Sequence, residues 1–254
     1  MAYTLERKNL DMSDFRKTFY QSYMSTFKEA QSRPDDWSVE DFWKWCEYKY
    51  LPLLKGVPHD APILELGCGA GLLLEFLRRQ GYSKVEGIDV SPEQIERAKE
   101  RRLNAEVADV FEFLQSKENL YGAILAIDFV EHFTRQELLR LIPLVYKALL
   151  EKGVFILQTA NGQGLFPHPV IYGDLTHMTI LSPASLGQLL RPAGFQEIQF
   201  YETGPVPKNF KGKVRVVLWK LIKLAANSVR IIETGKTQES WTTNVICRCR
   251  KPHS

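Results

Sequence analysis

The sequence has few cysteines, and their positions argue against the common cysteine-based sites. The four cysteines are Cys46, Cys68, Cys247 and Cys249. No pair has zinc-finger spacing, and Cys247 and Cys249 are predicted to share one face of a strand. The stretch 1–14 is polar and charged, so no signal peptide is predicted. Free thiols without a signal peptide favour a reducing, cytoplasmic compartment.

The sequence also lacks a long uninterrupted apolar run and a strong net charge. The amphipathic stretch 211–232 is repeatedly interrupted by lysine and arginine, so it cannot span a bilayer. The total net charge is +3, yet the segment 207–236 holds eight basic residues and one acidic residue, a charge of +7 that leaves −4 elsewhere. We therefore predict a basic helical insertion on a mildly acidic body. No internal repeat or low-complexity tract is present.

The chain is organised around the stretch 61–89. The apolar run 63–66 is typical of a buried strand, and it is followed by three glycines at alternate positions and then by apolar residues at helical spacing. A second strand-like run ends on Asp89. Glycines permit backbone conformations closed to other residues and let a ligand lie against the main chain. This order indicates half of a nucleotide-binding βαβ unit.

The pattern from Glu65 to Gly71, E-x-G-x-G-x-G, resembles that of the class I S-adenosylmethionine-dependent methyltransferases. It differs from the G-x-G-x-x-G pattern of dinucleotide folds. The alternative interpretation of this stretch is a Rossmann dehydrogenase or a non-binding α/β turn. The resemblance implies that the glycine loop binds the methionine part of the cofactor, Asp89 the ribose and Asp109 the adenine amino group. A surface aspartate is the alternative for Asp109. The cofactor-binding residues expected are Glu65, Gly67, Gly69, Gly71, Asp89, Val90, Asp109, Val110 and Asp128.

Strands that alternate with helices predict an α/β fold, a doubly wound, mostly parallel sheet of seven strands with ligands at the carboxyl ends of the strands. The resemblance adds a final antiparallel strand at one edge, which 242–249 could supply. Residues 57–254 would form the methyltransferase domain, with the insertion 207–236 before the last strand. Residues 1–56 would form an N-terminal helical cap, which either flanks the sheet or closes over the cofactor. Candidates for contact with the cofactor there are Arg16, Tyr20 and Tyr23.

Two histidines are the candidate catalytic bases. Transfer of a methyl group from a sulfonium requires alignment with the nucleophile and, for a hydroxyl acceptor, a group that takes its proton. His132 follows the fourth predicted strand, and His177 lies in the connection 162–181, which is long enough to be a lid. Imidazole titrates near neutrality, which suits this role. A structural role, in the turn for His132 or in lid packing for His177, is the alternative for each.

The segment Asp128-x-x-Glu131-His132 has a second interpretation. In a helical turn the two carboxylates and the imidazole would share one face and could hold a divalent ion. The segment resembles the E-x-x-E-H segment of quinone-biosynthesis O-methyltransferases, in which a metal orients the acceptor. Asp128 replaces the first glutamate of that pattern. We assign no residue as a metal ligand on this basis.

The segment 172–195 is similar to that of bacterial methyltransferases found among surface-polysaccharide genes, as are the stretch 203–207 and the basic helix after it. This similarity implies a sugar hydroxyl as acceptor, and O-methylation of a sugar or glycan intermediate is the first hypothesis. An O-methyltransferase for a quinone or other small aromatic is second. A nucleic-acid methyltransferase is third, and no nucleic-acid partner is expected because a proline pair is missing after the fourth strand. A non-catalytic cofactor-binding module is fourth.

The amphipathic stretch 211–232 has two possible partners. It could lie on an anionic membrane surface with Trp219, Leu221 and Ile222 buried, which would suit a lipid-linked glycan acceptor at the inner membrane face. It could instead pack on protein, as a lid or in a homodimer.

Overall fold

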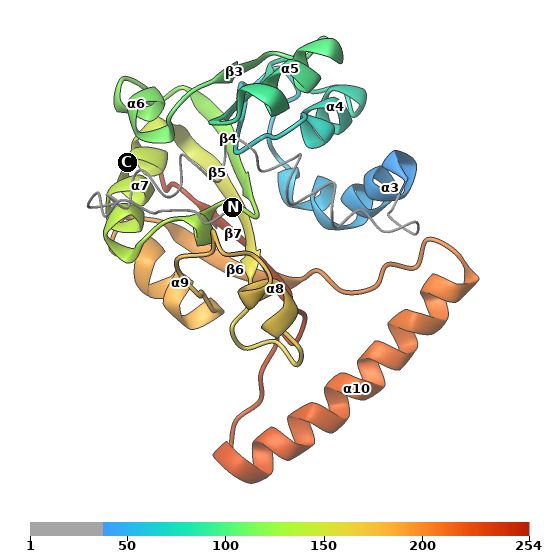
Figure 1. Ribbon diagram of the computed structural model, residues 1–254. Helices are drawn as coiled ribbons and strands as arrows, with labels where there is room; N and C mark the ends of the chain where they lie inside the picture. The colour runs from blue at the N-terminus through green and yellow to red at the C-terminus, as the bar shows by residue number, and fades with distance from the viewer. Residues whose placement is uncertain (1–37, 254) are drawn as a thin grey trace, which may run out of the picture.

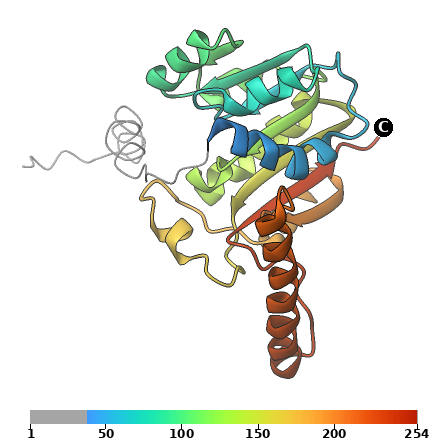
Figure 2. The same cartoon turned by 90° about the vertical axis from the view of Figure 1, so that its right-hand side faces the viewer.

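The computed structural model describes residues 38–253, which form a mixed seven-stranded sheet covered by helices (Figures 1 and 2). The strand order is β3-β2-β1-β4-β5-β7-β6, and β7 runs antiparallel to both of its neighbours. The strands are β1 (Ile63–Leu66), β2 (Val85–Asp89), β3 (Ala105–Val107), β4 (Tyr121–Ile127), β5 (Leu149–Ala160), β6 (Gln196–Glu202) and β7 (Asn244–Arg250). The predicted doubly wound α/β fold is confirmed.

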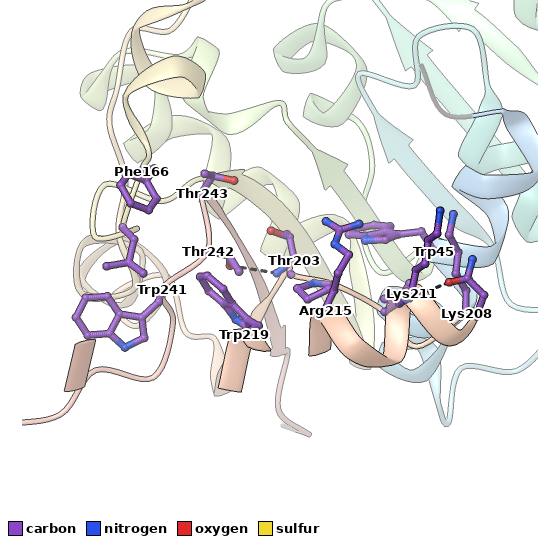
Figure 3. A pocket seen from close by; sticks show the side chains of 16 residues that line it. Trp45, Phe166, Thr203, Lys208, Lys211, Arg215, Trp219, Trp241, Thr242 and Thr243 are labelled. Carbon is purple, nitrogen blue, oxygen red and sulfur yellow. Dashed lines mark hydrogen bonds between the residues drawn. The ribbon is translucent and has the colours of Figure 1, made fainter. Parts of the chain in front are cut away.

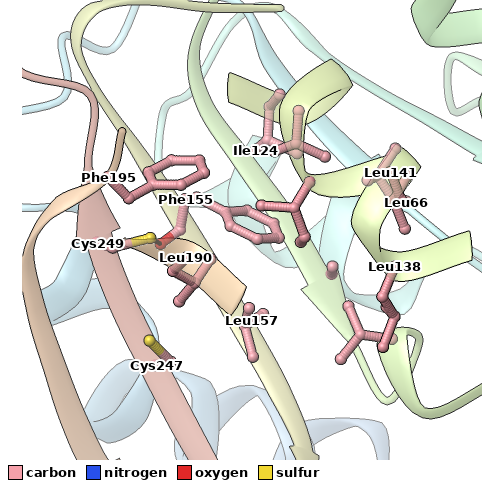
Figure 4. Packing of buried hydrophobic residues seen from close by; sticks show 14 of the residues in the cluster. Leu66, Ile124, Leu138, Leu141, Phe155, Leu157, Leu190, Phe195, Cys247 and Cys249 are labelled. Carbon is pink, nitrogen blue, oxygen red and sulfur yellow. Dashed lines mark hydrogen bonds between the residues drawn. The ribbon is translucent and has the colours of Figure 1, made fainter. Parts of the chain in front are cut away.

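Helices pack on both faces because the central strands are apolar on both faces. One core cluster joins the sheet to α6 (Val110–Gln115), α7 (Arg135–Ala148) and α9 (Pro183–Leu190), and Figure 4 shows part of it. A second cluster joins the opposite face to α3 (Val39–Lys49), η2 (Leu51–Leu54) and α4 (Leu72–Arg79). The helix α5 (Pro92–Glu100) closes a smaller third cluster.

Local sequence signals set where these helices begin. The Ser91 side chain accepts the amide of Gln94 at the start of α5, with proline in the first turn. A reciprocal capping box between Thr134 and Glu137 starts α7, and a serine pair caps α9 in the same way. Each of these helices therefore begins at a side chain that caps an amide three residues later.

The last strand enters the sheet antiparallel, between β5 and β6. The resemblance implied such a strand, and β7 supplies it one position inside the edge. The side chains of Cys247 and Cys249 are both buried in the first core cluster, as their spacing predicted (Figure 4). On the other face, the Arg248 guanidinium donates to the Leu53 carbonyl at 2.9 Å and so holds η2 against the sheet.

The basic insertion is a single helix, α10 (Phe210–Thr234), that projects beyond the sheet in Figures 1 and 2. Its 25 residues span about 37 Å. Glu202 at the end of β6 anchors its inner face, because its carboxylate accepts from Trp219 Nε1 at 3.1 Å and pairs with Lys223 at 2.8 Å. Within residues 38–253 no helix combines the length and apolarity needed to cross a bilayer.

The proposed division of the chain at residues 56 and 57 stays a prediction. Helix α3 and η2 share the second core cluster with the sheet, so this part of the N-terminal segment packs on the body of the fold. Arg16, Tyr20 and Tyr23 lie outside the described residues.

Candidate functional site

The loop from β1 to α4 presents bare main chain at the carboxyl end of the sheet. Gly67, Gly69 and Gly71 have φ of 70°, 52° and 77°, which strongly disfavours residues with a Cβ atom. A Cβ atom would also lie 2.6 Å from the Phe129 ring at Gly67 and 2.4 Å from Leu103 at Gly71. Backbone geometry and close packing therefore both require glycine at the two outer positions.

Asp89 holds the glycine loop in place from the end of β2. Its Oδ2 accepts the amide of Gly69 at 2.9 Å, and its Oδ1 accepts the amide of Ser91 at 2.9 Å. The next residue, Val90, leaves 46% of its surface exposed at the same edge. An oriented carboxylate beside an exposed apolar side chain is suited to a ribose with a base next to it.

Glu65 is a buried carboxyl under the glycine loop. It is 4% exposed, and its Oε2 has no hydrogen-bond partner in the part of the chain that the structure describes. Burial raises the pKa of Glu65 well above its usual range, and the negative charge of Asp89 adds to this. A ligand that brings a hydrogen-bond donor or a cation here would satisfy the orphaned oxygen. The glycine loop, Asp89 and Glu65 thus fit the S-adenosylmethionine implied by the sequence.

Asp109 and Val110 lie at the end of β3, where adenine contacts were expected. The Asp109 Oδ1 accepts the amides of Phe111 at 2.8 Å and Glu112 at 3.2 Å, which caps α6. Val110 is 4% exposed and packs in the first core cluster. Both positions therefore have a structural role, and their contact with adenine stays a prediction.

Asp128 ends β4 in a polar network that the sequence analysis missed. Gln158 Nε2 donates to both of its carboxylate oxygens, at 3.0 and 3.1 Å, and Asn244 Nδ2 lies 3.4 Å from Oδ1. The Tyr50 hydroxyl donates to Gln158 Oε1 at 2.9 Å. The network joins four segments that are distant in sequence, so no local pattern could reveal it.

The structure does not bring Asp128, Glu131 and His132 together as three ligands. Only Val130–His132 form a short helical turn, and Asp128 precedes it with a φ of 49°, outside any helix. The condition for a single helical face is therefore not met at Asp128. Within residues 38–253 no group of three or more His, Cys, Asp or Glu side chains is arranged to hold a metal ion. Burial, and next the charge of Asp128, raise the pKa of Glu131 to about 8.

His132 is held by a chain of hydrogen bonds, the Asp174–Thr176–His132 relay. The Thr176 hydroxyl donates to Asp174 Oδ1 at 2.6 Å and lies 2.9 Å from His132 Nδ1. Since this hydroxyl gives its proton to the carboxylate, its oxygen accepts from Nδ1. The Thr176 carbonyl, 3.3 Å from Nδ1, accepts from it as well. These two acceptors favour the neutral tautomer that carries its proton on Nδ1.

The two candidate bases lie side by side. The rings of His132 and His177 are 4.9 Å apart between centroids and meet edge to face. His177 Nδ1 is buried without a hydrogen-bond partner among the described residues. The amides of Met178 and Thr179 donate to the Glu131 carbonyl at 2.8 and 3.1 Å, which fixes the long connection against the turn that carries His132.

The environment keeps His132 neutral near physiological pH. Its pKa is lowered to about 4, mainly by burial and then by His177. The charge of Asp174 and the backbone carbonyls of Thr176 and Asp128 act in the opposite direction but do not offset burial.

Comparison with known proteins agrees with this fold. A family profile described as "Methyltransferase domain" matches residues 42–199. Ubiquinone biosynthesis O-methyltransferase, mitochondrial, from Mus musculus is 29% identical over 228 residues, which cover 70% of this chain and 60% of the mouse protein. The chain thus spans less than two thirds of that relative.

Solved structures show the same architecture. A SAM-dependent methyltransferase from Archaeoglobus fulgidus aligns with a TM-score of 0.64 at 20% identity and covers 92% of this chain and 100% of its own. Haemonchus contortus phosphoethanolamine N-methyltransferase 2, solved with S-adenosyl-L-methionine, aligns with a TM-score of 0.58 at 15% identity over 92% of this chain and 60% of its own. At such identities the likeness concerns the fold alone.

Proposed function

The chain belongs to the S-adenosylmethionine-dependent methyltransferase family, and from this premise we propose that the protein methylates a hydroxyl group of a sugar or glycan intermediate. The observation that carries the proposal is the Asp174–Thr176–His132 relay at the carboxyl end of β4. An alcohol is a weak nucleophile, and an oriented, neutral imidazole next to the cofactor site supplies the base it needs.

The bound cofactor supplies an electrophilic methyl group and a neutral thioether as the leaving group. The residues of this chain align the reactants and move one proton. Glu65, the glycine loop and Asp89 hold the cofactor. His132 accepts the hydroxyl proton on Nε2 as the oxygen–carbon bond forms, and Asp174 stabilises the resulting imidazolium through Thr176.

The second candidate is an O-methyltransferase for a quinone or other small aromatic. It is favoured by one observation, the similarity to the mouse ubiquinone biosynthesis O-methyltransferase over 70% of this chain. A phenol is more acidic than an alcohol, so that reaction depends less on a base. The two candidates therefore differ in how strongly they require His132.

The experiment that tests these functions follows the methyl label. Purified protein is incubated with labelled S-adenosylmethionine and an extract from cells that lack the gene, with and without EDTA, and the products are extracted with butanol. Label in polar sugar or lipid-linked glycan, unaffected by EDTA, supports the first proposal. EDTA-sensitive label on a small apolar product supports the second, and no label despite cofactor binding supports a non-catalytic module.

The pH dependence should report the lowered pKa of His132. Catalysis needs the neutral imidazole, so kcat/KM should stay level at neutral pH and fall only as the pH approaches about 4, rather than near 6.5. The same shift makes folding stability decline as the pH falls from 6.5 towards 4, because the unfolded chain binds the proton more readily. Initial rates across this range, with folding checked by circular dichroism, would measure it. An acid limb centred at 6.5 would contradict the assignment.

The outer face of α10 is a broad apolar surface. Its exposed members are Phe210, Val214, Val217, Leu218, Leu221, Ile222, Leu224, Val229, Ile231 and Ile232. Lysines and arginines flank this face, among them Lys213 and Lys220 on one side and Arg215 on the other. This combination fits an anionic membrane surface, and we include peripheral contact with the inner face of a cytoplasmic membrane in the proposed function.

Vesicle binding should depend on this outer face. Leu224→Glu is expected to lower partitioning onto vesicles with anionic lipid by about tenfold, because one apolar side chain is no longer buried. Leu139→Glu on α7 is the matched control, since both leucines are 66% exposed. Co-sedimentation measures binding and light scattering measures mass. Equal binding of the two variants would refute membrane contact, and a dimer lost only in Leu224→Glu would identify a second copy as the partner.

A further inference from the structure

A cavity of about 510 Å³ lies where α10 begins (Figure 3). We call it the α10 cavity. Its walls come from the connection between β6 and α10, the first turns of α10, the segment before β7, the connection after β5 and the middle of α3. The side chains that shape it are Trp45, Phe166, Lys208, Lys211, Arg215, Trp219 and Trp241. The volume falls in the usual range for a small-molecule site.

The charges that line the α10 cavity have one sign. Lys208, Lys211 and Arg215 line it, and no acidic side chain does. Lys208 pairs with Asp41, whereas Lys211 and Arg215 form no ion pair or hydrogen bond with any described residue. The amino end of α10 adds partial positive charge at the same place. The α10 cavity therefore favours an anion.

The other walls of the cavity are aromatic and rigid. Trp45 and Trp241 are 8% and 9% exposed, so their rings are held by packing. The indole N–H of Trp219 donates to Glu202 at 3.1 Å, and that of Trp241 donates to the Gln238 carbonyl at 3.0 Å. The three indole rings therefore give the cavity a fixed, aromatic wall.

Along the strand order of the sheet, the strand that precedes His132 lies between the cofactor strands and the strands next to the α10 cavity. The glycine loop follows β1, His132 follows β4, and the cavity lies where β6 ends and β7 begins. The hydroxyls of Thr203 and Thr242, in its wall, donate to the Asn244 carbonyl at 3.1 and 2.6 Å. Asn244 in turn contacts Asp128. An acceptor that enters from this side meets the cavity first.

We propose that the α10 cavity binds the phosphate-bearing end of a glycosyl phosphate or diphosphate, with the sugar directed towards His132. Lys211 and Arg215 hold the phosphate, and the tryptophan rings of the wall contact the first sugar. This inference rests on the proposed function, whose acceptor it specifies. A soluble nucleoside diphosphate sugar and a lipid-linked sugar share this chemistry.

Binding can be measured without any methyl transfer. In calorimetry with the full chain, glucose 1-phosphate should bind at least about tenfold more tightly than glucose or inorganic phosphate alone, because each half occupies only part of the cavity. The double variant Lys211→Ala/Arg215→Ala should lose about tenfold or more of this affinity. Lys213→Ala/Lys220→Ala is the matched control, because these lysines lie on α10 outside the cavity lining and should leave binding unchanged.

Two results would overturn the inference. One is glucose 1-phosphate that binds no tighter than glucose, and the other is an equal loss of affinity in both double variants. Methyl label on a small apolar product, or none at all, would contradict the proposed function without altering this binding result. Two further ligands then distinguish the sources: uridine diphosphate glucose in solution and a polyprenyl phosphate glucose in neutral vesicles. The source is the ligand whose affinity for the native chain exceeds its affinity for Lys211→Ala/Arg215→Ala.

Discussion

His132→Gln should lower kcat by about 10²–10⁴-fold while the affinity for S-adenosylmethionine changes little. The amide side chain fills much of the space of the ring but cannot take a proton from an alcohol. The cofactor groups lie on the loop after β1 and at the end of β2, on segments other than the turn that carries His132. Single-turnover rates and calorimetry with the cofactor would separate the two effects.

Two controls identify what His132 contributes. His177→Gln replaces the neighbouring ring, whose Nδ1 has no hydrogen-bond partner within residues 38–253, and should lower kcat far less if His132 is the base. Thr176→Val removes only the hydroxyl that orients the imidazole and should shift the acid limb of the pH profile as well as lower kcat. A larger loss in His177→Gln than in His132→Gln would assign the base to His177. If the acid limb of Thr176→Val fell at the same pH as in the native protein, the relay would have no positioning role.

The cofactor half of the fold could be predicted because its signals are local. The glycine turn, the strand before it and Asp89 fall within 27 residues, and each has one backbone role that few other residues can fill. The caps of α5 and α7 are equally local, because a side chain and the amide it caps are three residues apart. Fold class followed from the alternation of such elements.

The acceptor half could be predicted only in part, because its contacts are not local. Both histidines were candidates, but 45 residues separate them, and only the packing of the long connection on the turn brings their rings together. The relay through Asp174 depends on the same packing. The metal interpretation depended on a helical turn, and the positive φ of Asp128 places that residue outside one. Sequence spacing alone does not give the path of a turn.

Asp89→Ala should lower the affinity for S-adenosylmethionine by about 10²-fold or more, because two hydrogen bonds from the ribose hydroxyls to a carboxylate are lost together. The substitution also leaves the amides of Gly69 and Ser91 without their acceptor, so the glycine loop is less well ordered before the cofactor arrives. Both effects lower affinity, and neither acts on the base at His132.

Calorimetry with S-adenosylhomocysteine would measure this loss without turnover. Asp60→Ala is the matched control, because that aspartate is exposed in the turn before β1 and should leave the affinity unchanged. Asp89→Asn should be intermediate, since its amide oxygen can still accept one backbone amide but carries no charge. If Asp89→Ala bound as tightly as Asp60→Ala, the ribose would have to be held elsewhere. Glu65, whose buried Oε2 has no hydrogen-bond partner among residues 38–253, would then be the next acid to test.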